Sequence, residues 1–189
     1  MAPAMTTQTR PTPANPDAST MRALLVATLL SGTFLLTGCA PITSVQPGTP
    51  AKDVVSKYGK PKVVCPQSDG STRLVWTSQP AGEAAWATKM TADKRVGGFQ
   101  QVLNNAHFDV LNSGTWTAEM VRCEFGPPAE VESYPSGRNR GTVWSYHYMS
   151  PSGLFKLFNV NFGEDGQTVR SFDTDVDPER DPSMFGFSN

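Results

Sequence analysis

Histidine is scarce in this sequence, and the motifs that usually carry catalysis or metal binding are missing. The 189 residues include two histidines, His107 and His147. Neither has a cysteine or a carboxylate at a spacing typical of a zinc site or a catalytic triad. The turn from Ser150 to Gly153 lacks the Gly-x-Ser-x-Gly frame of a nucleophile elbow. We therefore expect no enzymatic activity, no metal ion and no cofactor.

Runs of like charge are also missing. The formal net charge is −1, from 16 Lys and Arg against 17 Asp and Glu. The basic residues are scattered along the chain, which gives no support for a nucleic-acid partner or for a patch that binds anionic membrane. The acidic turn at Glu164 and Asp165 does not continue into the 12-residue loop of a calcium site.

One apolar run is present, but it is short for a transmembrane helix. Leu24 to Cys39 covers about 16 residues, whereas a spanning helix needs about 20. The run follows Met21 and Arg22 and ends in Gly-Cys-Ala-Pro rather than in a basic stop-transfer flank. A basic start, an apolar middle and small residues at the end are the three parts of a bacterial secretion signal. We favour that signal over the alternative, a membrane-spanning helix with an ordinary cysteine.

The end of the run, Leu36-Thr37-Gly38-Cys39, resembles the lipobox of bacterial lipoproteins. The resemblance implies that Cys39 is diacylated, that the peptide is cut before it and that the new amino terminus is acylated. Three acyl chains anchor firmly, because each buried methylene contributes roughly 0.8 kcal/mol. Ala40, rather than Asp, follows the cysteine, and resemblance to the known sorting pattern then implies the periplasmic face of the outer membrane. Residues 1–38 are expected to be a leader and signal peptide, with Met21 as an alternative translation start.

The mature chain begins with a predicted helix and a set of strands. Residues 39–46 are expected to be a lipidated stalk. Pro47 to Pro50 predicts a helix start with Thr49 as N-cap, and Ala51 to Tyr58 has helical apolar spacing that ends at Gly59. Short segments rich in β-branched and aromatic residues predict strands at 62–65, 72–78, 84–90 and 96–103. Residues 47–103 therefore form the first expected unit.

This pattern recurs in the second half of the mature chain. A shift of 67 positions aligns Asp53 with Met120 and Gly59 with Gly126. A shift of 68 positions aligns Trp76 with Trp144. The second unit is expected at 113–173, with strands at 129–134, 142–148, 156–162 and 168–172. Residues 104–112 are predicted to be a connecting helical turn. Residues 174–189 are predicted to be an acidic, disordered tail.

The two helix phrases, GTPAKDVVSKYGKP and GTWTAEMVRCEFGPP, resemble the SmpA/OmlA (BamE-like) family of outer-membrane lipoproteins. Two such units in tandem also resemble the β-lactamase inhibitory protein-like fold. These resemblances imply an α+β fold in which helices pack on one face of an antiparallel sheet. They also imply a scaffold or assembly factor that binds other envelope proteins, with the β-barrel assembly machinery as a candidate partner. The alternative is a tethered inhibitor of a periplasmic hydrolase such as a β-lactamase.

Two cysteines remain after lipidation, Cys65 and Cys123. An oxidising compartment allows a disulfide between them, and the alternative is that both are small buried apolar residues. Sequence alone does not decide between these interpretations.

Large aromatic and charged residues outside the repeat are the candidates for partner binding. Aromatic side chains are enriched at interface hot spots, although most can also fill a core. Strand alternation places Trp144, Tyr146 and Tyr148 on one face and His147 on the other. Residues without a repeat counterpart, together with the charges of the 135–141 loop, give the candidate set: Trp116, Tyr134, Arg138, Arg140 and Tyr148.

Overall fold

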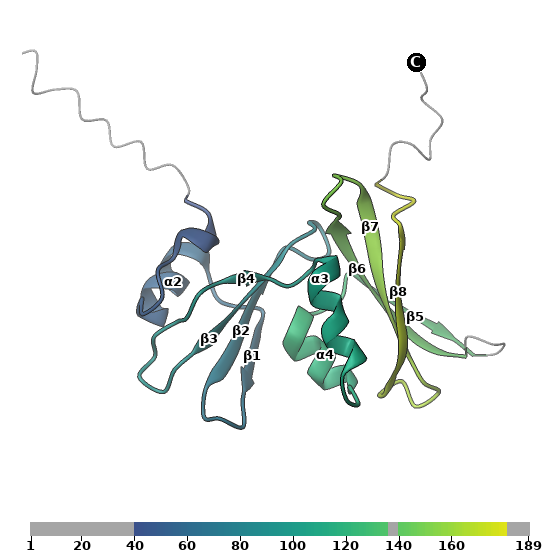
Figure 1. The fold of residues 1–189 in the computed structure, drawn as a ribbon, viewed down its shortest axis with the longest axis horizontal. Coiled ribbons are helices and arrows are strands. Elements are labelled where there is room, and N and C mark those ends of the chain that lie inside the picture. The colour runs from purple at the N-terminus through teal and green to yellow at the C-terminus, as the bar shows by residue number, and fades with distance from the viewer. Residues whose placement is uncertain (1–39, 136–139, 181–189) are drawn as a thin grey trace, which may run out of the picture. The chain divides into compact units, whose positions relative to one another are not determined.

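Residues 40–135 and 140–180 are described by a computed structural model, shown in Figure 1. They form two four-stranded antiparallel sheets and a few short helices, an α+β structure. The predicted signal peptide and the lipidation site at Cys39 lie outside the described residues. Arg138 and the end of the predicted tail lie outside them as well.

The first sheet follows the predicted helix. Helix α2, Ala51–Tyr58, has the predicted bounds, but Pro50 rather than Thr49 occupies the N-cap position. The strands of sheet 1 lie in the order β1-β2-β3-β4: Val63–Pro66, Thr72–Thr77, Ala85–Met90 and Gln100–Gln101. The strand expected at 96–103 is therefore mostly absent. Val96 instead bridges Met90 and exchanges backbone hydrogen bonds with the segment that precedes α2.

The expected stalk is part of the fold from Pro41 onward. Residues Ile42–Ser44 form the 3₁₀ helix η1. Ile42 is buried and packs in one cluster with Val54 of α2 and with Leu74 and Trp76 of β2. The prediction of a stalk at 39–46 is wrong for these residues, because an isoleucine with apolar partners gains more from packing than from remaining in water.

The second sheet follows a helical segment. The predicted connecting turn is confirmed by α3, Asn105–Phe108, and η2, Asp109–Asn112. Helix α4, Ala118–Phe125, is capped by the Thr117 side chain, which accepts a hydrogen bond from the Met120 amide. The strands of sheet 2 lie in the order β5-β6-β7-β8: Glu130–Tyr134, Gly141–Met149, Phe155–Phe162 and Val169–Val176.

Strand β8 runs further than the sequence pattern predicts. It was expected to end at residue 172, with a disordered tail from 174. It continues to Val176, and the next residue, Asp177, is buried. The predicted boundary of the tail is therefore wrong up to Arg180, and residues 181–189 lie outside the described part of the chain.

Helices cover both faces of sheet 1. Side chains alternate along β2, so Leu74 and Trp76 pack toward α2 while Val75 packs with Val121 and Phe125 of α4. The expectation of helices on one face only is not met in sheet 1. Figure 1 shows α4 between the two sheets, and the α4 cluster continues into the inner face of sheet 2.

The core between α4 and sheet 2 is aromatic. Phe108 of α3 stacks on Phe158 of β7 with ring centroids 3.7 Å apart, and Tyr148 meets Phe108 edge-on at 5.0 Å. Phe125 of α4 also contacts Phe158 edge-on. The edge-on contacts are arrangements that aromatic quadrupoles favour, whereas the nearly face-to-face stack of Phe108 on Phe158 gains from burial and dispersion instead. The centre of the inner face of sheet 2 is therefore used for packing, whereas Val131 of β5 stays 58% exposed.

An equivalent hydrogen bond from an aromatic side chain reaches the C-cap carbonyl of α2 and of α4. The Trp76 indole donates to the carbonyl of Gly59, the C-cap of α2, at 2.8 Å. The Tyr146 hydroxyl donates to the carbonyl of Gly126, the C-cap of α4, at 3.1 Å, and burial raises the pKa of Tyr146. Strand register places Tyr146, not Trp144, at the position equivalent to Trp76. The sequence repeat aligns Trp76 with Trp144, which lies two residues before its structural equivalent, Tyr146.

Candidate functional site

The outer face of sheet 2 is polar, and no helix in the described part of the chain packs on it. We call it the polar face. Its side chains line a groove of about 450 Å³. The residues that line this groove are Glu130, Glu132, Tyr134, Val143, Ser145, His147, Leu157, Asn159, Asn161, Asp173, Asp177, Pro178 and Glu179.

Strand register builds the polar face in rows across the sheet. Glu130 pairs with Ser145, Ser145 with Asn159, and Asn159 with Asp173, so one residue from each strand lies in the same row. Alternation then turns the intervening residues, Tyr146 among them, toward α4. The polar face is therefore set by the two-residue period of four neighbouring strands.

A hydrogen-bonded ladder orders the middle of the polar face. The Ser145 hydroxyl donates to Asn159 Oδ1 at 2.9 Å. The side-chain amides of Asn159 and Asn161 each donate to one carboxylate oxygen of Asp173, both at 3.0 Å. These side chains are held in one arrangement before any ligand arrives, which lowers the entropy lost on binding.

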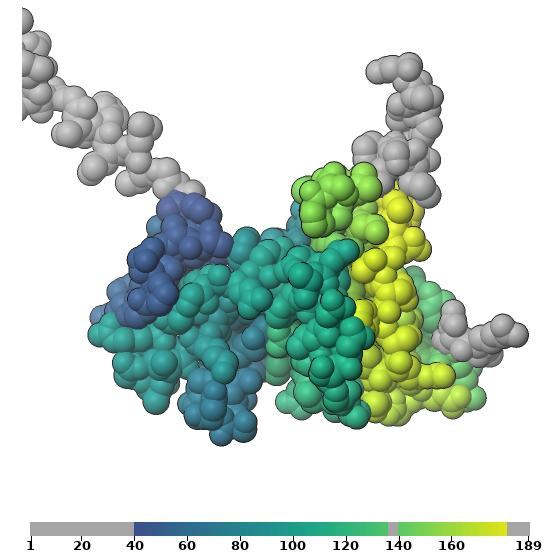
Figure 2. All heavy atoms as spheres, in the orientation of Figure 1, coloured from purple at the N-terminus to yellow at the C-terminus, as the bar shows by residue number. Residues whose placement is uncertain are grey.

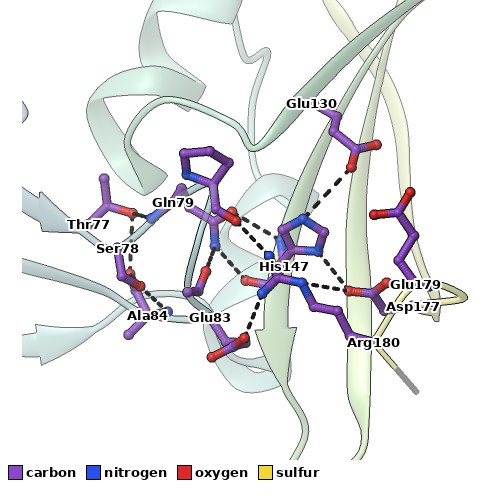
Figure 3. Close-up of polar contacts among 12 residues, drawn as sticks. Thr77, Ser78, Gln79, Glu83, Ala84, Glu130, His147, Asp177, Glu179 and Arg180 are labelled. Atoms are coloured by element: carbon purple, nitrogen blue, oxygen red, sulfur yellow. Dashed lines mark hydrogen bonds and ion pairs between the residues drawn. The ribbon is translucent and has the colours of Figure 1, made fainter. Parts of the chain in front are cut away.

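His147 lies buried at one end of the groove, between two carboxylates, as Figure 3 shows. Its Nδ1 lies 2.7 Å from Asp177 Oδ2, and its Nε2 lies 3.8 Å from Glu130 Oε1. The Asp177 side chain is 1% exposed, so its carboxylate is contacted by His147 and Arg180 rather than by water. His147 thus holds the segment after β8 against the sheet.

The same point connects sheet 2 to the loop between β2 and β3. The Gln79 side chain donates to the His147 carbonyl at 2.7 Å and accepts from the His147 amide at 3.3 Å. Arg180 pairs with Glu83 at 2.6 Å and donates to the Pro80 carbonyl at 2.7 Å (Figure 3). Side chains from three segments therefore fix the geometry at this end of the groove.

The potential of the groove is negative. Five of the lining residues are acidic, and no lysine or arginine lines the groove in the described part of the chain. At its edge the Tyr134 hydroxyl donates to the Glu132 carboxylate. That hydrogen bond, with the neighbouring negative charge, raises the pKa of Tyr134. Cationic groups are therefore favoured in this groove over anionic ones.

The arrangement around His147 does not include a nucleophile. Both ring nitrogens face carboxylates, and the hydroxyl of Ser145 is directed to Asn159 instead. Residues 40–135 and 140–180 contain no group of three or more His, Cys, Asp or Glu side chains placed to hold a metal ion. The described residues of the groove thus offer hydrogen bonds and charge.

A second polar cluster and a disulfide connect sheet 1 to α4. Cys65 of β1 and Cys123 of α4 form a disulfide, with their Cα atoms 5.9 Å apart. Beside it Arg73 donates to the last carbonyls of α4 and pairs with Glu124 at 2.6 Å. Burial lowers the pKa of Arg73, and the Glu124 carboxylate opposes that shift. His107 Nε2 also lies 2.6 Å from Glu124, so this cluster is structural.

Of the candidate residues predicted from sequence, Tyr134 and Arg140 line one pocket at the end of β5, and the other described ones lie elsewhere. Tyr134 is exposed and lies on the polar face. Arg140 is exposed and lies 3.5 Å from Glu164, whereas Trp116 is half-buried and donates to the Ser113 carbonyl. Tyr148 is fully buried, so its predicted role in partner binding is wrong: its ring is needed in the aromatic core.

Most residues of the polar face were missed by sequence reasoning, although a signal was present. Acidic and amide residues alternate along β5 and β7, at Glu130 and Glu132 and at Asn159 and Asn161. A period of two with polar residues on one side is typical of a strand with one solvated face. The contact between His147 and Asp177 has no such signal, since 30 residues separate them.

Comparisons give no independent identification of the chain. No helix in the described ranges has the length and apolar character needed to cross a membrane. Neither family models, nor curated proteins, nor solved structures match the chain, so the SmpA/OmlA resemblance depends on the sequence phrases alone.

Proposed function

We propose that this chain is a non-enzymatic lipoprotein of the bacterial cell envelope that binds other envelope proteins through its polar face. It is held on the periplasmic side of the outer membrane by lipid on Cys39. It consists of two tandem SmpA/OmlA-like units, each a helix followed by an antiparallel meander. The candidate role is that of a scaffold or assembly factor, with the β-barrel assembly machinery as its candidate partner.

One observation carries the binding role: sheet 2 packs one face against the helical segment and leaves the other open with its polar groups already ordered. The inner face holds Phe158 and Tyr146 at 0% exposure. The outer face holds the Ser145, Asn159 and Asp173 ladder beside a groove. Preordered donors and acceptors on an open sheet suit the polar contacts of a non-obligate protein interface.

The disulfide supports the proposed compartment. Disulfides persist in the periplasm and are rare where thiols are kept reduced. The bond between Cys65 and Cys123 is consistent with secretion directed by the apolar run that ends at Cys39. Lipid attachment has its own test: Cys39→Ser should leave an uncleaved precursor that takes up no radioactive palmitate. If that variant still took up palmitate normally, the lipidated residue would not be Cys39.

The binding role is tested by affinity purification of the tagged, lipidated protein after mild crosslinking of envelopes. The face variant is Glu130→Lys with Glu132→Lys, and the control is Asp109→Lys with Glu119→Lys, two exposed acidic residues outside the groove. We expect wild type and control to recover a common set of envelope proteins that the face variant loses. Recovery of the assembly machinery supports the scaffold role. Recovery of a hydrolase instead would favour a tethered inhibitor. If wild type, control and face variant recovered the same envelope proteins equally, the proposal that the polar face binds them would be contradicted.

A further inference from the structure

The described part of the fold begins, in sequence, close to the predicted lipid attachment site. Pro41 is two residues beyond Cys39, and its carbonyl accepts a hydrogen bond from Tyr58 of α2 at 3.2 Å. Ile42 is already part of the core. Because a chain spans at most about 3.5 Å per residue, Pro41 lies within about 7 Å of the acylated residue. If Cys39 is lipidated, as the proposed function holds, no stalk separates the body from the bilayer.

The turn between β6 and β7 lies on the same side of the fold as η1. Figures 1 and 2 show both at the upper edge of the view. Two exposed apolar side chains flank this turn, Met149 at 47% and Leu154 at 48% exposure. Residues 149–155, MSPSGLF, include no charged side chain. Met149 and Leu154 are two of the six large apolar side chains that are exposed in the described part of the chain, and exposed apolar groups that lie together favour burial against an apolar partner.

The turn can leave water at low cost. The Ser150 amide donates to the Leu154 carbonyl at 2.9 Å, and the Gly153 amide donates to the Ser150 carbonyl at 2.9 Å. The Ser150 hydroxyl accepts from the Leu154 amide at 3.1 Å. Backbone groups that are satisfied internally do not resist entry into a lipid interface. The nearby Arg180 is paired with Glu83, so its charge is compensated.

We propose that the β6–β7 turn inserts Met149 and Leu154 into the headgroup region of the membrane that holds the lipid of Cys39. The inference rests on the lipid anchor of the proposed function. Two apolar side chains bind a membrane weakly by themselves, but a tether raises their effective concentration to about the millimolar range, where weak contacts are occupied. With two points of attachment the body has a fixed orientation. The strands of sheet 2 then rise from the bilayer, and the polar face opens sideways into the periplasm (Figure 1).

The test uses the lipidated protein in phosphatidylcholine vesicles and a fluorophore that lipid-bound nitroxide quenches. The label is attached at Leu154→Cys, or at Val64→Cys, a matched control that replaces a 59% exposed valine of β1. Cys65 and Cys123 remain paired and Cys39 is acylated, so only the introduced thiol reacts. We expect quenching at position 154 to exceed quenching at position 64 at least about threefold, because insertion brings the label to the headgroup depth.

A second substitution separates insertion from an effect of the label. Met149→Asp should reduce quenching at position 154 to the level of position 64, whereas Val131→Asp, at a 58% exposed valine, should leave it unchanged. Vesicle flotation and the mass of the amino-terminal peptide report the anchor itself. Protein that floats but shows equal quenching at both positions would overturn the turn insertion alone. Protein without lipid that does not float would overturn the proposed function and, with it, this inference.

Discussion

Removal of the disulfide should cost a large part of the stability of this protein. The bond joins Cys65 of β1 to Cys123 of α4 across a sequence separation of 58 residues. In the chain-entropy account, a crosslink that closes a loop of this length removes about 4 kcal/mol of conformational freedom from the unfolded chain at 25 °C. A domain of ordinary stability unfolds with about 5–15 kcal/mol, so this loss is severe. We therefore expect Cys65→Ser with Cys123→Ser to lower the free energy of unfolding by about 4 kcal/mol.

The measurement is urea denaturation followed by tryptophan fluorescence, comparing the oxidised wild type with the double variant. Reduction of the wild type should reproduce the stability of the variant, while a reductant should leave the variant unchanged. The slope of the free energy against urea should rise without the crosslink, because the unfolded chain then exposes more surface. If the free energy of unfolding fell by less than about 1 kcal/mol, the disulfide would not stabilise the protein by restricting the unfolded chain, because closure of a loop of this length should contribute more.

Three further perturbations follow from single contacts. Gly59→Ala should lower the free energy of unfolding by about 1–2 kcal/mol, measured in urea, because its φ of 78° is unfavourable for any residue with a Cβ. Arg73→Met should cost about 3 kcal/mol in the same assay, because it removes the guanidinium from the largely buried Glu124 carboxylate and from the last carbonyls of α4. Glu132→Gln should lower the pKa of Tyr134 toward its ordinary value, because the negative charge that disfavours the phenolate is gone; an NMR titration of the Tyr134 ring measures it.

Each of these has a matched control. Gly98→Ala should change stability by less than about 0.5 kcal/mol, because Gly98 has open space around it and no left-handed φ. Arg95→Met removes an exposed pair with Asp93 and should cost less than about 1 kcal/mol. Glu130→Gln should leave the pKa of Tyr134 unchanged. If a control variant changed the free energy of unfolding, or the pKa of Tyr134, as much as the variant it is paired with, the corresponding contact would not be the cause of the effect.

Local signals predicted the elements of this fold better than their packing. Helix α2 was predictable because Gly59 ends a run of helical spacing, and most strands were predictable from turn residues and β-branched runs. The position of α4 between two sheets was not, because sequence spacing does not say how many surfaces one helix contacts. The expectation for Tyr148 is wrong because absence from the repeat does not imply exposure, and strand alternation already places Tyr148 beside Tyr146 on the packed face.

The candidate site depends on both local and long-range features. The polar face follows from alternation within each strand, which sequence shows, and from the register between strands, which it does not. Arg180 and Glu83 meet only because β8 ends beside the β2–β3 loop. The contact between His147 and Asp177 likewise requires β8 to extend past its predicted end. Such contacts depend on topology rather than on sequence spacing.

The most direct test of the binding face is photo-crosslinking in living cells. A photoreactive amino acid replaces Glu132 on the polar face or, as a control, Lys89, an exposed residue of sheet 1. We expect an adduct with an envelope protein from position 132 and none from position 89, and we expect Glu130→Lys to abolish the adduct from position 132. An adduct from position 89 alone, or adducts from position 132 that persist with Glu130→Lys, would contradict it.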